Sequence, residues 1–281
     1  MTDSVIAPDR TSTDPTSAEE GGPTPAVARR AWLPIASVLT LLALGWGTWN
    51  VVAVLAHGER TDIVDYTEIR AVSIDNDDGW VTVRSDDGAD AVTVTTTISE
   101  GLRAPDVSAE VVDGQLVLES SCPSLMSTWC SVTYTIDVPT HTDVTVRSDN
   151  GRIELRGVLG AVDIGGDNGS IEADALEATS LRLETDNGSI RASGALAPVV
   201  TAETENGSTR LFFDRPPGAV DAESKNGSVE VVVPATGEAY DVDASSDNGG
   251  ETVSVPVDSR SDRRIDAHTR NGSVSVRTER G

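Results

Sequence analysis

An Asn-Gly pair between two stretches of alternating apolar residues occurs seven times in the second half of this chain. Successive glycines lie 18, 19, 19, 20, 22 and 23 residues apart. A period near 20 that drifts slowly is typical of supersecondary units that stack on one another, rather than of one irregular globule. The seven pairs are Asn150-Gly151, Asn168-Gly169, Asn187-Gly188, Asn206-Gly207, Asn226-Gly227, Asn248-Gly249 and Asn271-Gly272.

Alignment of the copies on their glycine predicts a shared core. A residue two positions later forms one small or apolar row: Ile153, Ile171, Ile190, Thr209, Val229 and Val274. A residue four positions later forms another: Leu155, Ala173, Ala192, Leu211, Val231, Val253 and Val276. The residues between these rows would point outward, so coils stacked about 4.8 Å apart would place Glu172 beside Arg191, and Arg210 beside Glu230.

The alternation, rich in Val, Ile and Thr, predicts an all-β domain. We expect a β-solenoid with about 20 residues per coil, in which Asn-Gly supplies the positive φ of a corner and the asparagines bond along a ladder. The alternative is a series of Asn-Gly hairpins forming an antiparallel meander or sandwich. A degenerate eighth copy spans 75–83, and the 72 residues between Gly79 and Gly151 would hold three or four further coils.

The N-terminal part predicts a membrane anchor. Residues 1–30 have the composition of a disordered tail, and residues 31–56 form an uncharged apolar stretch long enough for one transmembrane helix. Arg29 and Arg30 precede this stretch, which places the tail in the cytoplasm and the later residues outside the cell membrane. Residues 57–65 would be a linker and 66–281 the extracytoplasmic β-repeat domain. The alternative is a cleaved signal peptide.

The two cysteines, Cys122 and Cys130, fall in the predicted exported domain. A close pair outside the cytoplasm predicts a disulfide, with two buried free thiols as the alternative. Zinc binding is disfavoured because no histidine lies near the pair in the sequence.

The formal net charge of −25 argues against nucleic-acid binding, because phosphate binding requires clustered cations. Carboxylates precede several of the repeated asparagines, which raises the possibility of a calcium ladder, but Lys225 and Arg270 occupy the same column and disfavour it. The three histidines, His57, His141 and His268, lie in no recognisable catalytic phrase. We therefore predict no catalytic residue, no cofactor and no metal.

Three stretches carry a family resemblance: the repeated S-x-N-G-S phrases, the strand CSVTYTIDVP over 130–139 that follows the short cysteine loop, and the segment 138–151 that enters the first clear repeat. Together they resemble the bacterial membrane-anchored putative-adhesin family, β-strand-repeat domains of unknown function. The resemblance covers residues 66–276 and implies a β-helical surface domain.

The predicted function is that of a membrane-anchored, non-catalytic binding or adhesin-like module at the cell surface. Its partners would be the membrane, through one helix, and an unidentified surface protein or glycan. One alternative is an envelope-sensing or regulatory subunit that acts through the cytoplasmic tail. Another is a carbohydrate-active β-helix enzyme.

Overall fold

The computed structural model describes residues 58–86, 88–100, 103–123, 130–158 and 160–279. The chain divides into two units, Met1–Val52 and Ala53–Gly281, and every described residue belongs to the second. In these ranges there is no helix with the length and apolar character needed to span a membrane. The predicted tail and transmembrane helix over residues 1–56 lie outside the described residues.

Strands are the only regular secondary structure in the described ranges, and they form two sheets, which confirms the all-β prediction. Sheet A has the spatial order β1 (Gly58–Thr67), β4 (Ala91–Glu100), β7 (Ser131–Pro139), β3 (Val81–Asp86), β9 (Ile153–Arg156), β11 (Ile171–Glu177), β13 (Ile190–Leu196), β15 (Thr209–Phe213), β17 (Val229–Val233), β21 (Val274–Thr278) and β19 (Glu251–Ser254). Sheet B has the order β18 (Asp241–Asn248), β20 (Arg264–Asn271), β16 (Ala219–Asn226), β14 (Val199–Asn206), β12 (Ser180–Asn187), β10 (Ala161–Asn168), β8 (Asp143–Asn150), β2 (Ala71–Asp78), β6 (Gln115–Ser121) and β5 (Asp106–Val112).

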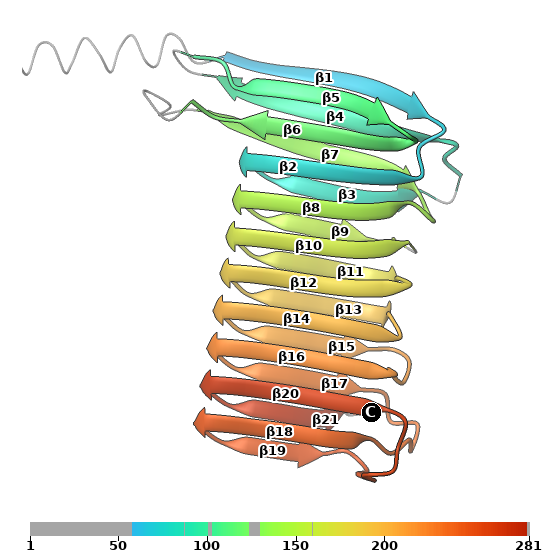
Figure 1. Ribbon diagram of the computed structural model, residues 1–281, viewed down its shortest axis with the longest axis vertical. Helices are drawn as coiled ribbons and strands as arrows, with labels where there is room; N and C mark the ends of the chain where they lie inside the picture. The colour runs from blue at the N-terminus through green and yellow to red at the C-terminus, as the bar shows by residue number, and fades with distance from the viewer. Residues whose placement is uncertain (1–57, 87, 101–102, 124–129, 159, 280–281) are drawn as a thin grey trace, which may run out of the picture. The chain divides into compact units, whose positions relative to one another are not determined.

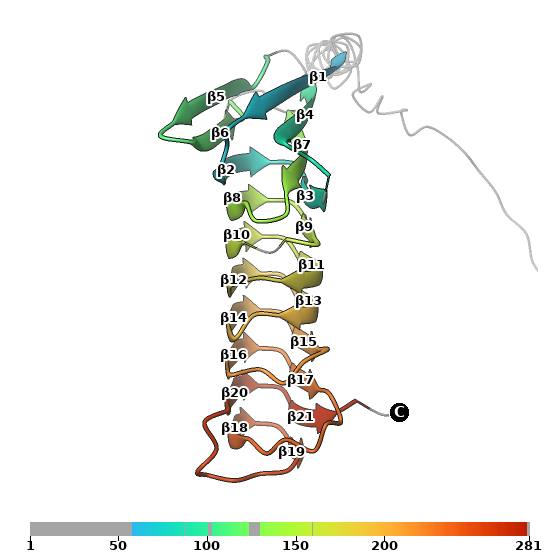
Figure 2. The same cartoon turned by 90° about the vertical axis from the view of Figure 1, so that its right-hand side faces the viewer.

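Each repeat forms one coil, in which a strand of sheet B runs into the Asn-Gly corner and a strand of sheet A leaves it (Figure 1). Neighbouring coils pair in parallel, with Asn168 opposite Asn187 in sheet B and Ile171 opposite Ile190 in sheet A. Figure 2 shows the two sheets edge-on, one coil above the next. Because hairpins would pair these units antiparallel, the parallel register is that of a solenoid and not of a meander.

The core lies between the two sheets, where every second side chain of most strands is buried. Strands β1, β5 and β19, which lie at sheet edges, are mainly exposed. The two predicted rows are buried, including Thr209, at 0% exposure. Val253 lies opposite the buried Val276 in parallel register, so its side chain points to the same inward face as predicted. It is nevertheless 43% exposed, because β19 is the edge strand of sheet A and no further described strand covers it.

The corner glycines serve a different purpose from the one expected. Of the seven, only Gly151 and Gly272 have a φ between +20° and +160°. A Cβ added to Gly188 would instead lie less than 3.0 Å from the carbonyl oxygen of Gly169 in the neighbouring coil, and a Cβ on Gly207 would meet Gly188 in the same way. Glycine is therefore needed mainly because successive corners approach too closely to admit a side chain.

The N-terminal end of the stack departs from the predicted series of coils. Gly79 donates its N–H directly to the carbonyl of Asn150, at 3.0 Å, so the degenerate copy stacks on the first clear repeat. Of the intervening strands, only β6 and β7 add a further coil to the stack. Strand β4 lies between β1 and β7 and pairs antiparallel with both. Strand β5 forms a hairpin with β6. The hairpin turn is Asp113-Gly114, with φ of 52° and 81°. The expectation of three or four coils is therefore wrong.

The predicted linker over 57–65 also requires correction, because residues from Gly58 onward form β1 and pair antiparallel with β4. The side chain of Asp65 accepts a 2.7 Å hydrogen bond from Thr93 of β4. Nearly all of β1 is exposed at the edge of sheet A, so its sequence carries no buried row that would predict a strand.

The two C-terminal coils exchange places. Strands β20 and β21 come last in the chain but lie between the β16–β17 coil and the β18–β19 coil. Residues 255–263 make the return path and bond to the chain where β18 begins: Tyr240 N–H donates to the Pro256 carbonyl at 3.0 Å, and Asp241 N–H to the Arg263 carbonyl at 2.8 Å. The β18–β19 coil at the end of the stack is thus connected to the rest of the domain by the chain before β18 and by the return segment after β19.

Candidate functional site: the acidic outer face of sheet B

The Asn-Gly edge is occupied by bonds within the protein. Each repeated asparagine donates its side-chain amide to an oxygen in the adjacent coil; Asn206 donates to Asn187 Oδ1 and Asn226 to Asn206 Oδ1, each at 2.9 Å. The complete ladder has the spatial order Asn150, Asn168, Asn187, Asn206, Asn226, Asn271 and Asn248. The structure therefore places the predicted turn residues in one row in which they stabilise stacking.

A second ladder is formed by the hydroxyl groups of Ser and Thr residues two positions before the asparagines, each bonded to a backbone carbonyl of the adjacent coil. Thr204 donates to the Gly188 carbonyl at 2.9 Å, Ser224 to Gly207 at 2.8 Å and Thr269 to Gly227 at 2.7 Å. All three side chains belong to buried residues. The sequence prediction missed this ladder, although the signal was present: the residue two positions before the asparagine is Ser or Thr in every copy except the one with Gly166.

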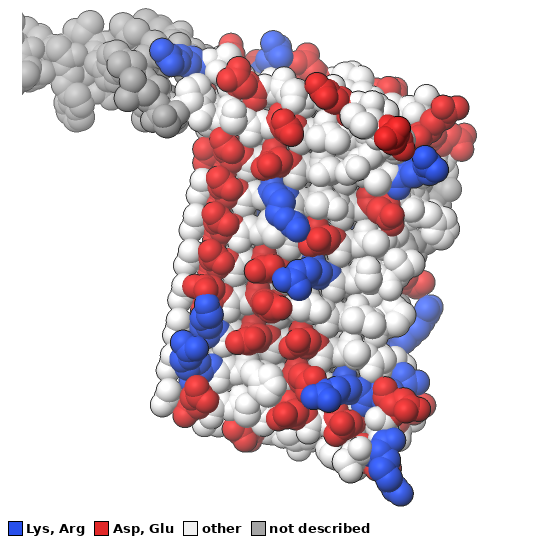
Figure 3. Space-filling view, viewed as in Figure 1, with Lys and Arg blue, Asp and Glu red and all other residues white. Residues whose placement is uncertain are grey.

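The outer face of sheet B carries charged residues in files, one residue per strand. We call the residues that precede the repeated asparagines, together with Asp77 at the equivalent position of β2, the leading file. In spatial order they are Asp77, Asp149, Asp167, Asp186, Glu205, Lys225, Arg270 and Asp247. Residues two positions earlier form the central file: Glu119, Asp75, Arg147, Gly165, Glu184, Glu203, Glu223, His268 and Ser245. Figure 3 shows acidic side chains aligned in files down this face, with basic residues at a few positions.

Much of this negative charge is uncompensated. Partial neutralisation comes from Arg147 with Asp163 at 3.1 Å, from Arg182 with Glu184 at 2.9 Å, and from Lys225 with Glu205. By contrast, Asp149, Asp167 and Asp186 form no ion pair with any residue of the described ranges. Such a face attracts cations and repels anions.

The pKa values of two carboxyl groups on this face, those of Asp149 and Glu203, are raised. Partial desolvation, followed by repulsion from Asp167 and Asp77, raises the pKa of Asp149. Desolvation also raises the pKa of Glu203, and repulsion from Glu184 adds to it, although Arg182 nearby opposes the shift. Glu203 lies in a hollow of about 170 Å³ between the leading and central files.

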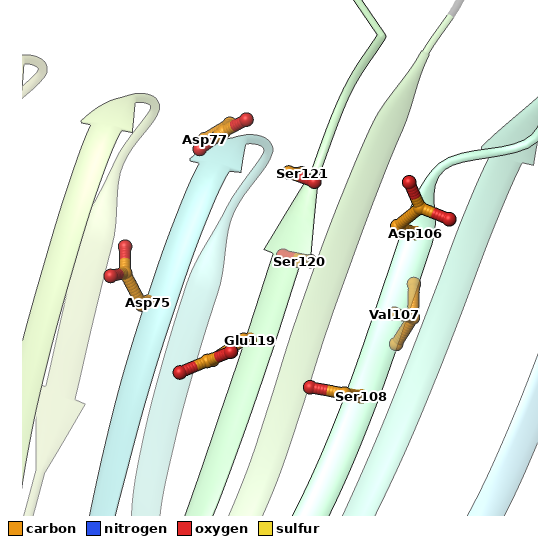
Figure 4. A pocket seen from close by; sticks show the side chains of 8 residues that line it. All are labelled: Asp75, Asp77, Asp106, Val107, Ser108, Glu119, Ser120 and Ser121. Carbon is orange, nitrogen blue, oxygen red and sulfur yellow. The ribbon is translucent and has the colours of Figure 1, made fainter.

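A larger polar cleft of about 540 Å³ lies where β2, β6 and β5 meet (Figure 4). Its carboxylates come from Asp75 and Asp77 on β2, Glu119 on β6 and Asp106 on β5, and Figure 4 shows Glu119 pointing towards β2. The remaining lining residues are Val107, Ser108, Ser120 and Ser121. The cleft thus extends the acidic face to this end of sheet B.

The outer face of sheet A is more balanced. Glu230 pairs with Arg277 at 2.9 Å and with Arg210 at 3.7 Å, and the latter is one of the two predicted pairs. Glu172 lies opposite Arg191 as expected, but the Arg191 guanidinium packs over the Phe212 ring, 4.6 Å from its centre. The acidic character is therefore specific to sheet B.

Cys122 and Cys130 form the predicted disulfide. The bond closes the loop between β6 and β7, and Cys122 N–H donates to Asp77 of the leading file at 3.1 Å. The alternative of two free thiols is excluded. Because the sequence predicted no catalytic residue and no cofactor, there is no predicted group of either kind to locate in the structure.

Comparison with solved structures finds low similarity. A putative adhesin from Bacteroides fragilis is 14% identical, with 79% of this chain and 97% of that chain covered and a TM-score of 0.47. A putative adhesin from Parabacteroides merdae is 13% identical, with coverage of 78% and 95% and a TM-score of 0.38. A putative lipid binding protein from Parabacteroides distasonis is 12% identical, with coverage of 79% and 97% and a TM-score of 0.24. No curated protein matches the chain.

A family profile described as Toastrack DUF4097 matches residues 81–281, well over half of the sequence. The match includes all seven Asn-Gly repeats and the disulfide loop. It confirms the resemblance to a family of β-repeat domains of unknown function, and this chain belongs to the Toastrack DUF4097 family.

Proposed function

We propose that the protein is a non-catalytic binding module, anchored in the cell membrane by residues 31–56, that presents the outer face of sheet B to a cationic partner outside the cell. The observation that carries the proposal is the set of carboxylate files on that face, with strands spaced about 4.8 Å apart. A basic segment of a surface protein, extended across the strands, could contact several carboxylates at once.

The solenoid suits such a role because the asparagine and hydroxyl ladders that link neighbouring coils lie at the Asn-Gly corner and not on the outer face. The asparagine and hydroxyl ladders hold neighbouring coils in register, while outward residues such as Glu203 and Glu223 are free of the core. Outward residues can therefore differ from coil to coil without loss of the fold. Specificity for a partner would reside in those differences.

The binding surface is tested with a fluorescent octalysine peptide and the purified full-length chain in mild detergent. The variant Glu184→Gln/Glu203→Gln/Glu223→Gln should bind the peptide about tenfold more weakly, because each lost charge contributes roughly 0.5 kcal/mol at an exposed site. The matched control is Glu154→Gln/Glu172→Gln/Glu230→Gln, which changes the net charge equally on the opposite sheet and should bind nearly as the wild type does. Equal losses in the two variants, or no binding by the wild type, would reject the proposal.

The anchor is tested separately in intact cells. Epitope tags at the two ends should show the C-terminus accessible to external antibody and the N-terminus only after lysis. The intact mass of the membrane-extracted protein distinguishes an anchor from a signal peptide, because cleavage would remove the N-terminal tag. Release of a shortened chain from the membrane would contradict anchoring.

A further inference from the structure

Three potential metal ligands converge on the outer face of sheet B near its C-terminal end. Asp243 on β18 lies directly opposite Asp266 on β20, and His268 follows Asp266 by two residues. Alternate residues of a strand share a face, so Asp266 and His268 point the same way. One donor atom from each of the three residues lies within 4.8 Å of the other two. Among the described residues, this is the cluster in which three potential metal-ligating side chains lie within this distance of one another.

The Asp266 carboxylate has an unmet bonding requirement. Its Oδ2 accepts a 2.5 Å hydrogen bond from Arg264 Nε, whereas its Oδ1 is shielded from solvent and has no hydrogen-bond partner. Buried polar oxygens without partners are uncommon because they lose their hydration without compensation. Register also stacks Asp221, Asp266 and Asp243 on three adjacent strands, so their carboxylates repel one another. Arg264 offsets part of this negative charge through its ion pair with Asp266, and a cation bound by the cluster would offset more.

The imidazole is held in place beside these carboxylates. His268 Nδ1 lies 2.7 Å from Ser245 Oγ, on the neighbouring strand β18. A hydrogen bond to one ring nitrogen is the usual way in which proteins orient a metal-binding histidine. The cluster is therefore more than an accumulation of acidic residues, since it combines a fixed imidazole, an unpartnered oxygen and a second carboxylate.

We propose that Asp243, Asp266 and His268 bind one zinc ion that ties the terminal coil to β20. One imidazole and two carboxylates suit zinc, whereas calcium and magnesium prefer ligands that are all oxygen. Tetrahedral zinc with bonds of about 2.0 Å needs donors roughly 3.3 Å apart, so donors that lie up to 4.8 Å apart would have to close by up to about 1.5 Å. Water would complete the coordination. The ion would stabilise a coil that has a neighbour on only one side.

The test is zinc titration of the purified full-length chain after removal of metals by chelation. Calorimetry should show one zinc ion per chain. His268→Ala and Asp243→Asn should each weaken binding by roughly tenfold or more. The matched control is Asp221→Asn, which removes the next carboxylate of the same stack but lies outside the cluster; it should keep the site. Circular dichroism of the variants without zinc establishes that they are folded.

Thermal unfolding separates a structural site from incidental binding. Zinc at 100 times its Kd should raise the Tm of the wild type and of Asp221→Asn by about 5 °C or more, and leave that of His268→Ala unchanged. Equal binding by all variants would show general attraction to the acidic face and overturn the proposal. It would also be overturned by a wild type that binds no zinc, or by one that binds zinc without a change in Tm.

Discussion

The side-chain amide of Asn271 donates a 2.9 Å hydrogen bond to Oδ1 of Asn226, 45 residues earlier in the chain. The asparagine of the intervening copy, Asn248, donates in turn to Asn271 at 3.1 Å. The hydrogen-bond ladder thus follows the order of coils in space, which differs from their order in the sequence. This exchange also brings the cations Lys225 and Arg270 to adjacent strands, with Asp247 at the end of the leading file.

Gly188→Ala should destabilise the domain strongly. The new Cβ would collide with the carbonyl of Gly169, a backbone atom that cannot move without disturbing the stack. Overpacking of this kind costs about 3 kcal/mol, which corresponds to a fall in Tm of roughly 6–12 °C for a domain of this size. The control is Gly250→Ala, where no atom lies within 4 Å of the added Cβ. Equal Tm values for the two variants in thermal denaturation would show that corner packing does not require glycine.

Thr204→Val should lower the free energy of unfolding by about 1–2 kcal/mol, because it leaves the Gly188 carbonyl without the donor that now lies 2.9 Å away. Ser148→Ala is the informative comparison. Its hydroxyl occupies the equivalent buried position but has no hydrogen-bond partner, so its removal should be neutral or slightly stabilising. Urea denaturation measures both, and a larger loss in Ser148→Ala would contradict the role assigned to the hydroxyl ladder.

Glu203→Gln should stabilise the protein at pH 7 but not at pH 4. Partial burial and like charge raise the pKa of Glu203 above its ordinary 4.5, so the folded state holds its proton to a higher pH than the unfolded state does. The resulting stability is fully present below the unfolded pKa and is lost as the pH rises through the folded pKa. Relative to wild type, the variant should gain about 1–2 °C in Tm at pH 7.

The same comparison at both pH values for Glu59→Gln, on the exposed edge strand β1, controls for the change in net charge. An equal gain at pH 4 and pH 7 for Glu203→Gln would mean that repulsion within the acidic face is not the cause.

Cys122→Ser/Cys130→Ser should lower the free energy of unfolding by about 2–3 kcal/mol, since the bond closes a short loop. The expected fall in Tm is roughly 4–12 °C. Reduction of the wild-type protein should produce a similar fall and should not affect the double variant. An unchanged Tm after reduction would show that the loop is held by its other contacts, including the bond from Cys122 N–H to Asp77.

Much of the solenoid could be predicted from the Asn-Gly phrase, because the phrase fixes the corner and the alternation beside it fixes which side chains point inward. Ile171 and Ile190 occupy the same place in two copies and are opposite each other in sheet A. The positions preceding asparagine likewise predicted a file of Asp149, Asp167, Asp186 and Glu205, with Lys225 and Arg270 as its interruptions. These inferences need only the local period and the two faces of a strand.

The order of the last two coils could not be predicted in this way. The copies at Gly249 and Gly272 share the Asn-Gly pair, so the corner alone does not tell which copy occupies which place. The copy at Gly249 differs in having Glu251 where the others have a small or apolar inward residue, and the spacings of 22 and 23 residues also distinguish this end of the chain. The return segment over 255–263 settles the order through long-range bonds such as that from Asp241 to Arg263. The juxtaposition of Asp243 and Asp266 could not be predicted for the same reason, since these residues are neighbours only across strands whose order the sequence does not reveal.

The coil order underlies the hydrogen-bond ladders and the charge files, and a disulfide tests it directly. Ser228 Oγ lies 3.2 Å from Ser273 Oγ, whereas stacking in sequence order would place these residues two coils, about 9.6 Å, apart. The double variant Ser228→Cys/Ser273→Cys should therefore form an intramolecular disulfide on mild oxidation, detected by mass spectrometry of proteolytic fragments, and the single variants should not. Failure of this pair to cross-link, together with efficient cross-linking of Ser228→Cys/Gly250→Cys, would contradict the exchanged order of the coils.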